Sequence, residues 1–195
     1  MLTKIAVFAS GAGSNFINIV NKINKQNINA EVALLISNNS NAGAIEFARK
    51  NNINIKIINK YRYKEENIIN KEYELSLKKN KIDLILLAGF MKKIPIDIIK
   101  IYENKILNIH PSLLPDYGGK SFYGMNVHNA VFDFKEKFSG ATVHYVNEKY
   151  DEGPILIQKK INIENCKNPD EIAKKVLKIE HEIFPEAVKK YLNKV

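Results

Sequence analysis

The sequence predicts an α/β protein with an open, mostly parallel twisted sheet, a C-terminal antiparallel strand pair and a final helix. Short apolar runs alternate with helically periodic segments through the first half of the chain. The run Asp83–Ala88 is continuously apolar after its first residue, which is typical of a strand buried on both faces. Two later segments alternate apolar and polar residues, as antiparallel strands do.

The first half alternates predicted strands with predicted helices. The strands are Ile5–Ala9, Glu31–Ile36, Asn54–Ile58 and Asp83–Ala88. The helices are a segment that carries Phe16, Ile19, Val20 and Ile23 at helical spacing, then Ala42–Lys50 and Lys64–Lys79. In such a sheet ligands bind beyond the carboxyl ends of the strands, so we expect the site residues there.

The second half begins with a glycine-containing loop and ends with a long helix. Its predicted elements are a loop over Asp116–Gly124, a helix over Met125–Phe134 and an antiparallel pair, Ala141–Val146 with Ile155–Ile161. The final helix has Asn168 as N-cap, Pro169 at its first position and Glu171 as the reciprocal capping residue. Its apolar stripe contains Ile172, Val176, Ile179 and Ile183. We expect Pro185 to kink this helix.

Composition indicates a single cytoplasmic domain of 195 residues. Cys166 is the only cysteine, so the chain has neither an internal disulfide nor a thiolate metal cluster. No apolar run is long enough to span a membrane, and the first residues lack the layout of a signal peptide. The net charge is +9, but the lysines are scattered and few aromatic residues interleave with them. We therefore expect no nucleic-acid partner.

The segment Leu107–Pro115 places an amide and an imidazole two residues apart at the end of an apolar run. Because alternate residues of a strand face the same side, Asn108 and His110 should share one face. Pro111 holds the preceding residue in an extended conformation. An amide that stabilises an oxyanion and an imidazole that moves or stabilises a proton together suit attack on a carbonyl group.

The segment Ser10–Asn15 follows the first predicted strand and opens the first predicted helix. Its glycines allow a tight turn, and the helix N-terminus offers free N–H groups to a phosphate. The segment matches neither the dinucleotide fingerprint nor the P-loop. A plain strand–helix turn capped by Ser14 or Asn15 is the alternative.

Asp151 lies in a loop before Gly153, where it is either an ordinary exposed acid or a carboxylate that orients or charges His110, or relays protons through water. His144, on the preceding predicted strand, either supports the site or is a buried histidine with its own partners. Histidine and acidic residues show no metal-ligand spacing, so we expect no metal.

These motifs resemble the folate-dependent formyltransferases over almost the whole chain, from about Lys4 to about Leu192. The matching stretches are Ser10–Asn15, Ala88-Gly89-Phe90-Met91, Asn108–Pro115 and Gly140–Pro154. The resemblance implies a Rossmann-like formyltransferase fold, with a phosphate-binding half over residues 1–100 and a catalytic, folate-binding half over residues 101–195. It also implies transfer of the formyl group of 10-formyltetrahydrofolate to the amine of 5'-phosphoribosylglycinamide, in de novo purine biosynthesis.

The resemblance assigns roles to individual residues. Asn108, His110 and Asp151 match the catalytic residues: after direct attack by the amine, Asn108 and protonated His110 would stabilise the oxyanion and Asp151 would assist proton transfer. Glu180 matches an acid that contacts the substrate ribose. The phosphate loop, defined here as residues 11–15, consists of Gly11, Ala12, Gly13, Ser14 and Asn15. The folate-binding residues are Lys64, Met91, Lys92, Lys93, Ile94, Val146, Asn147 and Tyr150. The family usually has proline where this chain has Gly118, which predicts a more flexible loop before Met125.

Other readings remain. A methionyl-tRNA formyltransferase would need a further C-terminal domain. A formyltetrahydrofolate hydrolase would need a further N-terminal domain. From this sequence we expect neither of these domains. A sugar-nucleotide formyltransferase would lack this form of the phosphate loop. A basic module that binds nucleotides or RNA would leave the three motifs unexplained. The sequence does not predict an oligomeric state.

Overall fold

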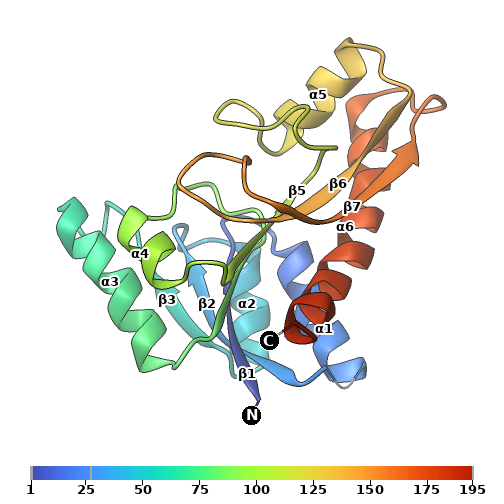
Figure 1. The fold of residues 1–195 in the computed structure, drawn as a ribbon. Coiled ribbons are helices and arrows are strands. Elements are labelled where there is room, and N and C mark those ends of the chain that lie inside the picture. The colour runs from blue at the N-terminus through green and yellow to red at the C-terminus, as the bar shows by residue number, and fades with distance from the viewer. Residues whose placement is uncertain (1, 27, 195) are drawn as a thin grey trace. The chain divides into compact units, whose positions relative to one another are not determined.

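The computed structural model describes residues 2–26 and 28–194; Met1 and Val195, the ends of the predicted domain, and Asn27 lie outside the described residues. The strands form a seven-stranded sheet in the hydrogen-bonded order β3-β2-β1-β4-β5-β6-β7 (Figure 1). The pairs β1–β2, β1–β4 and β2–β3 are parallel, and β6–β7 is antiparallel. The predicted fold class is confirmed. The chain divides into two compact units, Met1–Leu107 and Asn108–Val195.

The first unit alternates strands and helices as predicted. Its elements are β1 (Thr3–Phe8), α1 (Ser14–Lys25), β2 (Ala30–Ser37), α2 (Gly43–Lys50), β3 (Asn54–Ile57), α3 (Glu66–Lys79), β4 (Leu84–Leu87) and α4 (Ile96–Ile101). Every residue of β4 is buried, which explains its continuous apolar run. Helix α4 was not predicted, because six residues are too few to display a helical period.

The second unit holds the end of β5 (Ile106–His110) and the elements that follow. These are α5 (Met125–Asp133), β6 (Phe138–Tyr145), β7 (Ile155–Asn162) and α6 (Pro169–Leu192). The predicted antiparallel pair is confirmed, although β6 begins at Phe138 rather than at Ala141. Helix α6 packs against α5, β6 and β7. Pairing between β6 and β7 shifts register next to His144, which bends the strand before the loop that carries Asp151.

The start of α6 follows the predicted capping pattern. The Asn168 side chain accepts a hydrogen bond from the Glu171 N–H at 3.0 Å, and the Glu171 carboxylate accepts one from the Lys167 N–H at 2.9 Å. The helix continues past Pro185 to Leu192, so the proline does not end it. The kink expected at Pro185 stays a prediction. No helix in the described part of the chain is both long and apolar enough to cross a membrane.

Candidate active site

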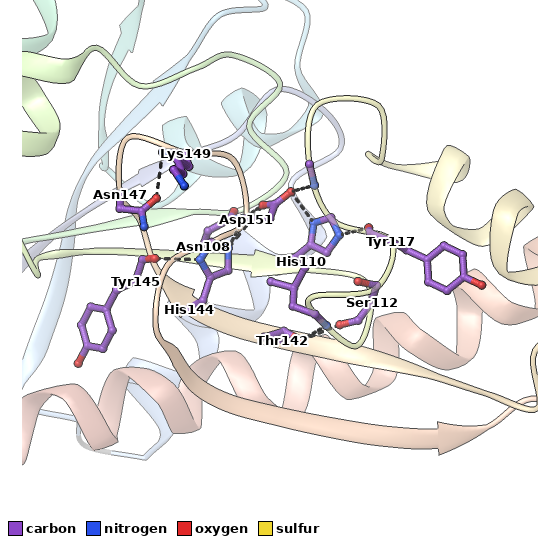
Figure 2. Close-up of polar contacts among 12 residues, drawn as sticks. Asn108, His110, Ser112, Tyr117, Thr142, His144, Tyr145, Asn147, Lys149 and Asp151 are labelled. Carbon is purple, nitrogen blue, oxygen red and sulfur yellow. Dashed lines mark hydrogen bonds and ion pairs between the residues drawn. The ribbon is translucent and has the colours of Figure 1, made fainter.

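The polar network of the second unit centres on the carboxylate of Asp151 (Figure 2). Asp151 Oδ2 accepts a hydrogen bond from the Gly119 N–H at 2.9 Å, and Oδ1 accepts one from Asn108 Nδ2 at 3.3 Å. His110 Nδ1 lies 3.6 Å from Oδ2, and His144 Nε2 lies 3.5 Å from Oδ1. One carboxylate therefore organises an amide, a backbone N–H and two imidazoles.

The strand β5 explains why Asn108 and His110 converge on one group. They are two residues apart, so their side chains leave the same face of the strand, while Leu107 and Ile109 are buried. The prediction that Asn108 and His110 share a face is confirmed. Asp151 reaches them from the loop between β6 and β7, where its φ of 56° is left-handed.

Gly153 lets this loop return close to β6. A Cβ atom at this position would lie 1.7 Å from the Tyr145 carbonyl oxygen. The Tyr145 N–H donates to the Pro154 carbonyl at 2.9 Å, which closes the loop at its base. The glycine between Asp151 and β7 is thus required by close backbone approach.

The hydrogen bonds of His110 fix the position of its proton. His110 Nε2 lies 2.7 Å from the Tyr117 carbonyl oxygen. A carbonyl only accepts, so Nε2 carries the hydrogen and donates it. In neutral His110 the Nδ1 lone pair consequently faces Asp151, and protonation there creates an ion pair with the carboxylate.

His110 and Asp151 differ in their protonation states at neutral pH. Burial lowers the pKa of His110 below its ordinary value, although the Asp151 charge and the Tyr117 carbonyl oppose this change. Burial alone would raise the pKa of Asp151, but the His144 side chain, the His110 charge and the Gly119 N–H outweigh it and hold this pKa below its usual range. At neutral pH the free protein therefore holds an ionised Asp151 beside a mostly neutral His110.

His144 supports Asn108. Its Nδ1 lies 2.9 Å from the Tyr145 carbonyl oxygen and so donates to it. His144 Nε2 lies 3.1 Å from Asn108 Nδ2 and 3.5 Å from Asp151 Oδ1, so it accepts from the amide when the ring is neutral and turns a proton toward the carboxylate when the ring is protonated. With His144 neutral, both N–H groups of the Asn108 amide are oriented, one by His144 and the other by Asp151.

Further polar residues that the sequence analysis missed hold the Pro111–Pro115 turn. Thr142 Oγ1 donates to the Ser112 carbonyl at 2.6 Å and accepts from the Leu114 N–H at 3.2 Å. Gln158 Nε2 donates to the Leu114 carbonyl and to Thr142 Oγ1, each at 2.9 Å. Two signals were available: Thr142 lies two residues before His144 on β6, and Gln158 is its cross-strand partner.

The phosphate loop of the first unit makes a tight turn into α1. Gly13 has a φ of 79°, and a Cβ atom there would lie 2.6 Å from Ala44 Cβ. The N-cap residue of α1, Gly13, makes no side-chain capping hydrogen bond, and the first N–H groups of a helix are the ones that bind anions. Ser10 fixes the start of the loop, because its Oγ donates to Asn38 and accepts from the Met91 N–H at 2.9 Å.

The other predicted binding residues are divided between the two units. In the first unit, Lys64, Met91, Lys92 and Lys93 are exposed and Ile94 is buried. In the second unit, Val146, Asn147 and Tyr150 lie at the end of β6 and in the loop after it, and Glu180 is buried on α6. Asn147 Oδ1 accepts a hydrogen bond from the Lys149 N–H at 2.9 Å, which shapes the start of this loop.

Histidine, cysteine and acidic side chains in residues 2–26 and 28–194 form no group of three that can hold a metal ion. His128, on α5, is buried, and its Nδ1 has no hydrogen-bond partner within the part of the chain that the structure describes. Burial and the charge of His110 lower the pKa of His128 to about 4.

Comparisons with known proteins agree with this fold. The formyl transferase family model matches residues 3–188. The chain is 41% identical over 186 residues to the chloroplastic phosphoribosylglycinamide formyltransferase of Arabidopsis thaliana, covering 95% of this chain and 64% of that relative. It is 36% identical over 191 residues to the phosphoribosylglycinamide formyltransferase of Bacillus subtilis, covering 98% and 95%. The chain therefore belongs to the formyl transferase family.

A solved structure supports the same relationship. The phosphoribosylglycinamide formyltransferase of Bacillus halodurans superposes with a TM-score of 0.90 at 31% identity, covering 98% of this chain and 96% of that chain. The chain spans 64% of the Arabidopsis relative and 59% of the relative from Vigna unguiculata.

Replacing Thr142 with valine should destabilise the protein, because it removes the hydroxyl that bonds the Ser112 carbonyl and the Leu114 N–H in a buried position. We expect the free energy of unfolding to fall by about 1–3 kcal/mol, as measured by urea denaturation. Thr142→Ser keeps the hydroxyl and should retain most of this stability. Equal losses in the two variants would show that the hydroxyl is not responsible.

Replacing His128 with leucine should flatten the dependence of stability on pH. Between pH 6.5 and about 4 the unfolded chain binds a proton at His128 that the folded protein does not bind. Stability therefore falls as the pH falls through this window, by about 3 kcal/mol from this residue. Urea denaturation near pH 7 and near pH 4 measures the difference. The same loss in both proteins would contradict the assignment.

Proposed function

We propose that this protein transfers the formyl group of 10-formyltetrahydrofolate to the amine of 5'-phosphoribosylglycinamide. The convergence of Asn108 and His110 on the carboxylate of Asp151 carries the proposal, because it combines an oxyanion donor with a proton-accepting pair. The relative from Bacillus subtilis, which the chain covers over 95% of its length, is named for this activity.

In this proposal the Asn108 amide stabilises the oxyanion that develops on the formyl group. The longer of its two hydrogen bonds, 3.3 Å to Asp151, is the one that yields to the oxyanion. The bond to His144 meanwhile keeps the amide plane fixed. Because the amide is oriented before the reaction, only this one hydrogen bond has to exchange as charge develops.

Asp151 and His110 handle the proton. The substrate nitrogen forms a bond to the formyl carbon, and the bond from that carbon to the folate nitrogen breaks. The proton lost by the attacking amine passes through Asp151 to His110 Nδ1, whose lone pair faces the carboxylate. The ionised Asp151 and the oxyanion both favour the imidazolium that results. The proton then returns to the departing folate nitrogen.

The remaining proposed roles are the binding of the substrate and of the folate by residues of the two units. The phosphate loop binds the substrate phosphate through the N–H groups at the start of α1, and Glu180 binds the ribose. The folate contacts Lys64 and residues 91–94. It also contacts the segment that includes Val146, Asn147 and Tyr150. No nucleic acid, membrane or metal takes part in this reaction, and we place it in the cytoplasm, within de novo purine biosynthesis.

Replacing Asp151 with asparagine should lower kcat for substrate-dependent formyl transfer by about 100- to 1000-fold, since the charge that favours imidazolium is lost. The folate absorbance change measures this rate. Glu152→Gln is the matched control, because its exposed carboxylate is next in sequence and pairs only with Lys149 among the contacts described. It should keep nearly full activity.

The dependence of turnover on each substrate distinguishes formyl transfer from hydrolysis. Turnover that needs both phosphoribosylglycinamide and formyl folate supports the proposal. Turnover without the glycinamide would indicate a hydrolase instead. A folded protein that shows no transfer to the glycinamide would contradict the proposal, whatever the effect of the Asp151 substitution.

A further inference from the structure

Tyr117 has a strained backbone next to the proposed catalytic histidine. Its φ is 54°, in the left-handed region that aromatic residues rarely adopt. In this conformation its carbonyl oxygen accepts a hydrogen bond from His110 Nε2 at 2.7 Å. The ring points away from His110 (Figure 2). The backbone of Tyr117 therefore contacts His110, while its side chain points away from the site.

The side chain of Tyr117 is anchored at its far end. Its hydroxyl donates to Glu136 Oε1 at 2.8 Å, and its ring packs edge-on against Phe122 at 5.8 Å and beside Phe134 at 6.2 Å between ring centroids. The backbone of Glu136 is held next to α5, because its N–H donates to the Val131 carbonyl. These contacts oppose relaxation of the strained backbone.

The groups that face His110 come from several elements. Asp151 approaches from the loop after β6, His144 from β6 and His128 from α5, and the Tyr117 carbonyl comes from the loop after β5. The charge of Asp151 and the Tyr117 carbonyl favour protonated His110, whereas burial and the charge of His144 oppose it. Turning the carbonyl away would remove one of the two favourable interactions.

We propose that Tyr117 and Glu136 form a tether that positions the proposed catalytic residue His110 by holding the Tyr117 carbonyl against Nε2. The inference rests on the proposed function for the role of His110. Without the tether, residue 117 relaxes toward negative φ, the carbonyl turns, and His110 loses its fixed proton on Nε2. Tyr117 and Glu136 are positioning residues and contact no substrate.

Tyr117→Phe tests the tether, because it removes the hydroxyl but keeps the ring between Phe122 and Phe134. We expect the NMR titration midpoint of the His110 ring to fall by roughly half a unit, with no substrate present. We also expect kcat to fall about threefold, with KM for both substrates unchanged. Tyr123→Phe on the same loop is the control, since Tyr123 is 55% exposed.

Changes at Glu136 separate the tether from a general effect on folding. Glu136→Ala should reproduce the effect of Tyr117→Phe, whereas Glu136→Gln keeps an oxygen acceptor and should restore the wild-type titration. The double variant Tyr117→Phe/Glu136→Ala should be no worse than either single variant, because both remove one hydrogen bond.

Two outcomes would overturn the tether. One is an unchanged His110 titration and kcat in both Tyr117→Phe and Glu136→Ala; the other is an equal change in Tyr123→Phe. If the wild-type protein does not formylate the glycinamide, the proposed function fails. The titration in the substrate-free protein still decides whether the tether positions His110.

Discussion

The ionised carboxylate of Asp151 is the interaction on which the site of the second unit depends. It is largely withdrawn from water, so its charge persists only because polar groups surround it. Asn108 and Gly119 donate hydrogen bonds to it, and His110 and His144 face it. Removal of the charge would release all of these contacts together, which makes the network a single cooperative unit rather than a set of independent residues.

This constraint explains several otherwise unrelated features of the chain. Gly153 lets the loop after β6 approach Tyr145, and the left-handed Asp151 then points its side chain toward β5. Thr142 and Gln158 tie the turn after His110 to β6 and β7. The backbone geometry of the loops, more than the chemistry of their side chains, therefore determines where the carboxylate lies. The proton on His110 is fixed in the same way, by a backbone carbonyl.

Much of this arrangement could be predicted from the sequence, because strand periodicity and capping chemistry are local. The shared face of Asn108 and His110 follows from their spacing on β5, and the start of α6 follows from Asn168 and Glu171. The contacts that depend on chain reversal could not be predicted. Nothing local in the sequence reveals that the Gly119 N–H meets Asp151, or that Tyr117 adopts a positive φ. Helix α4 was too short to show a period.

The roles proposed for the site residues follow from geometry, and kinetics test them. A kinetic cycle over Asn108→Ala, Asp151→Asn and the double variant, using kcat for formyl transfer to phosphoribosylglycinamide, tests the central claim most directly. If the two residues act as one unit around the carboxylate, the double variant should be about as slow as the slower single variant. Losses that multiply would show that Asn108 and Asp151 act independently, and would contradict the account.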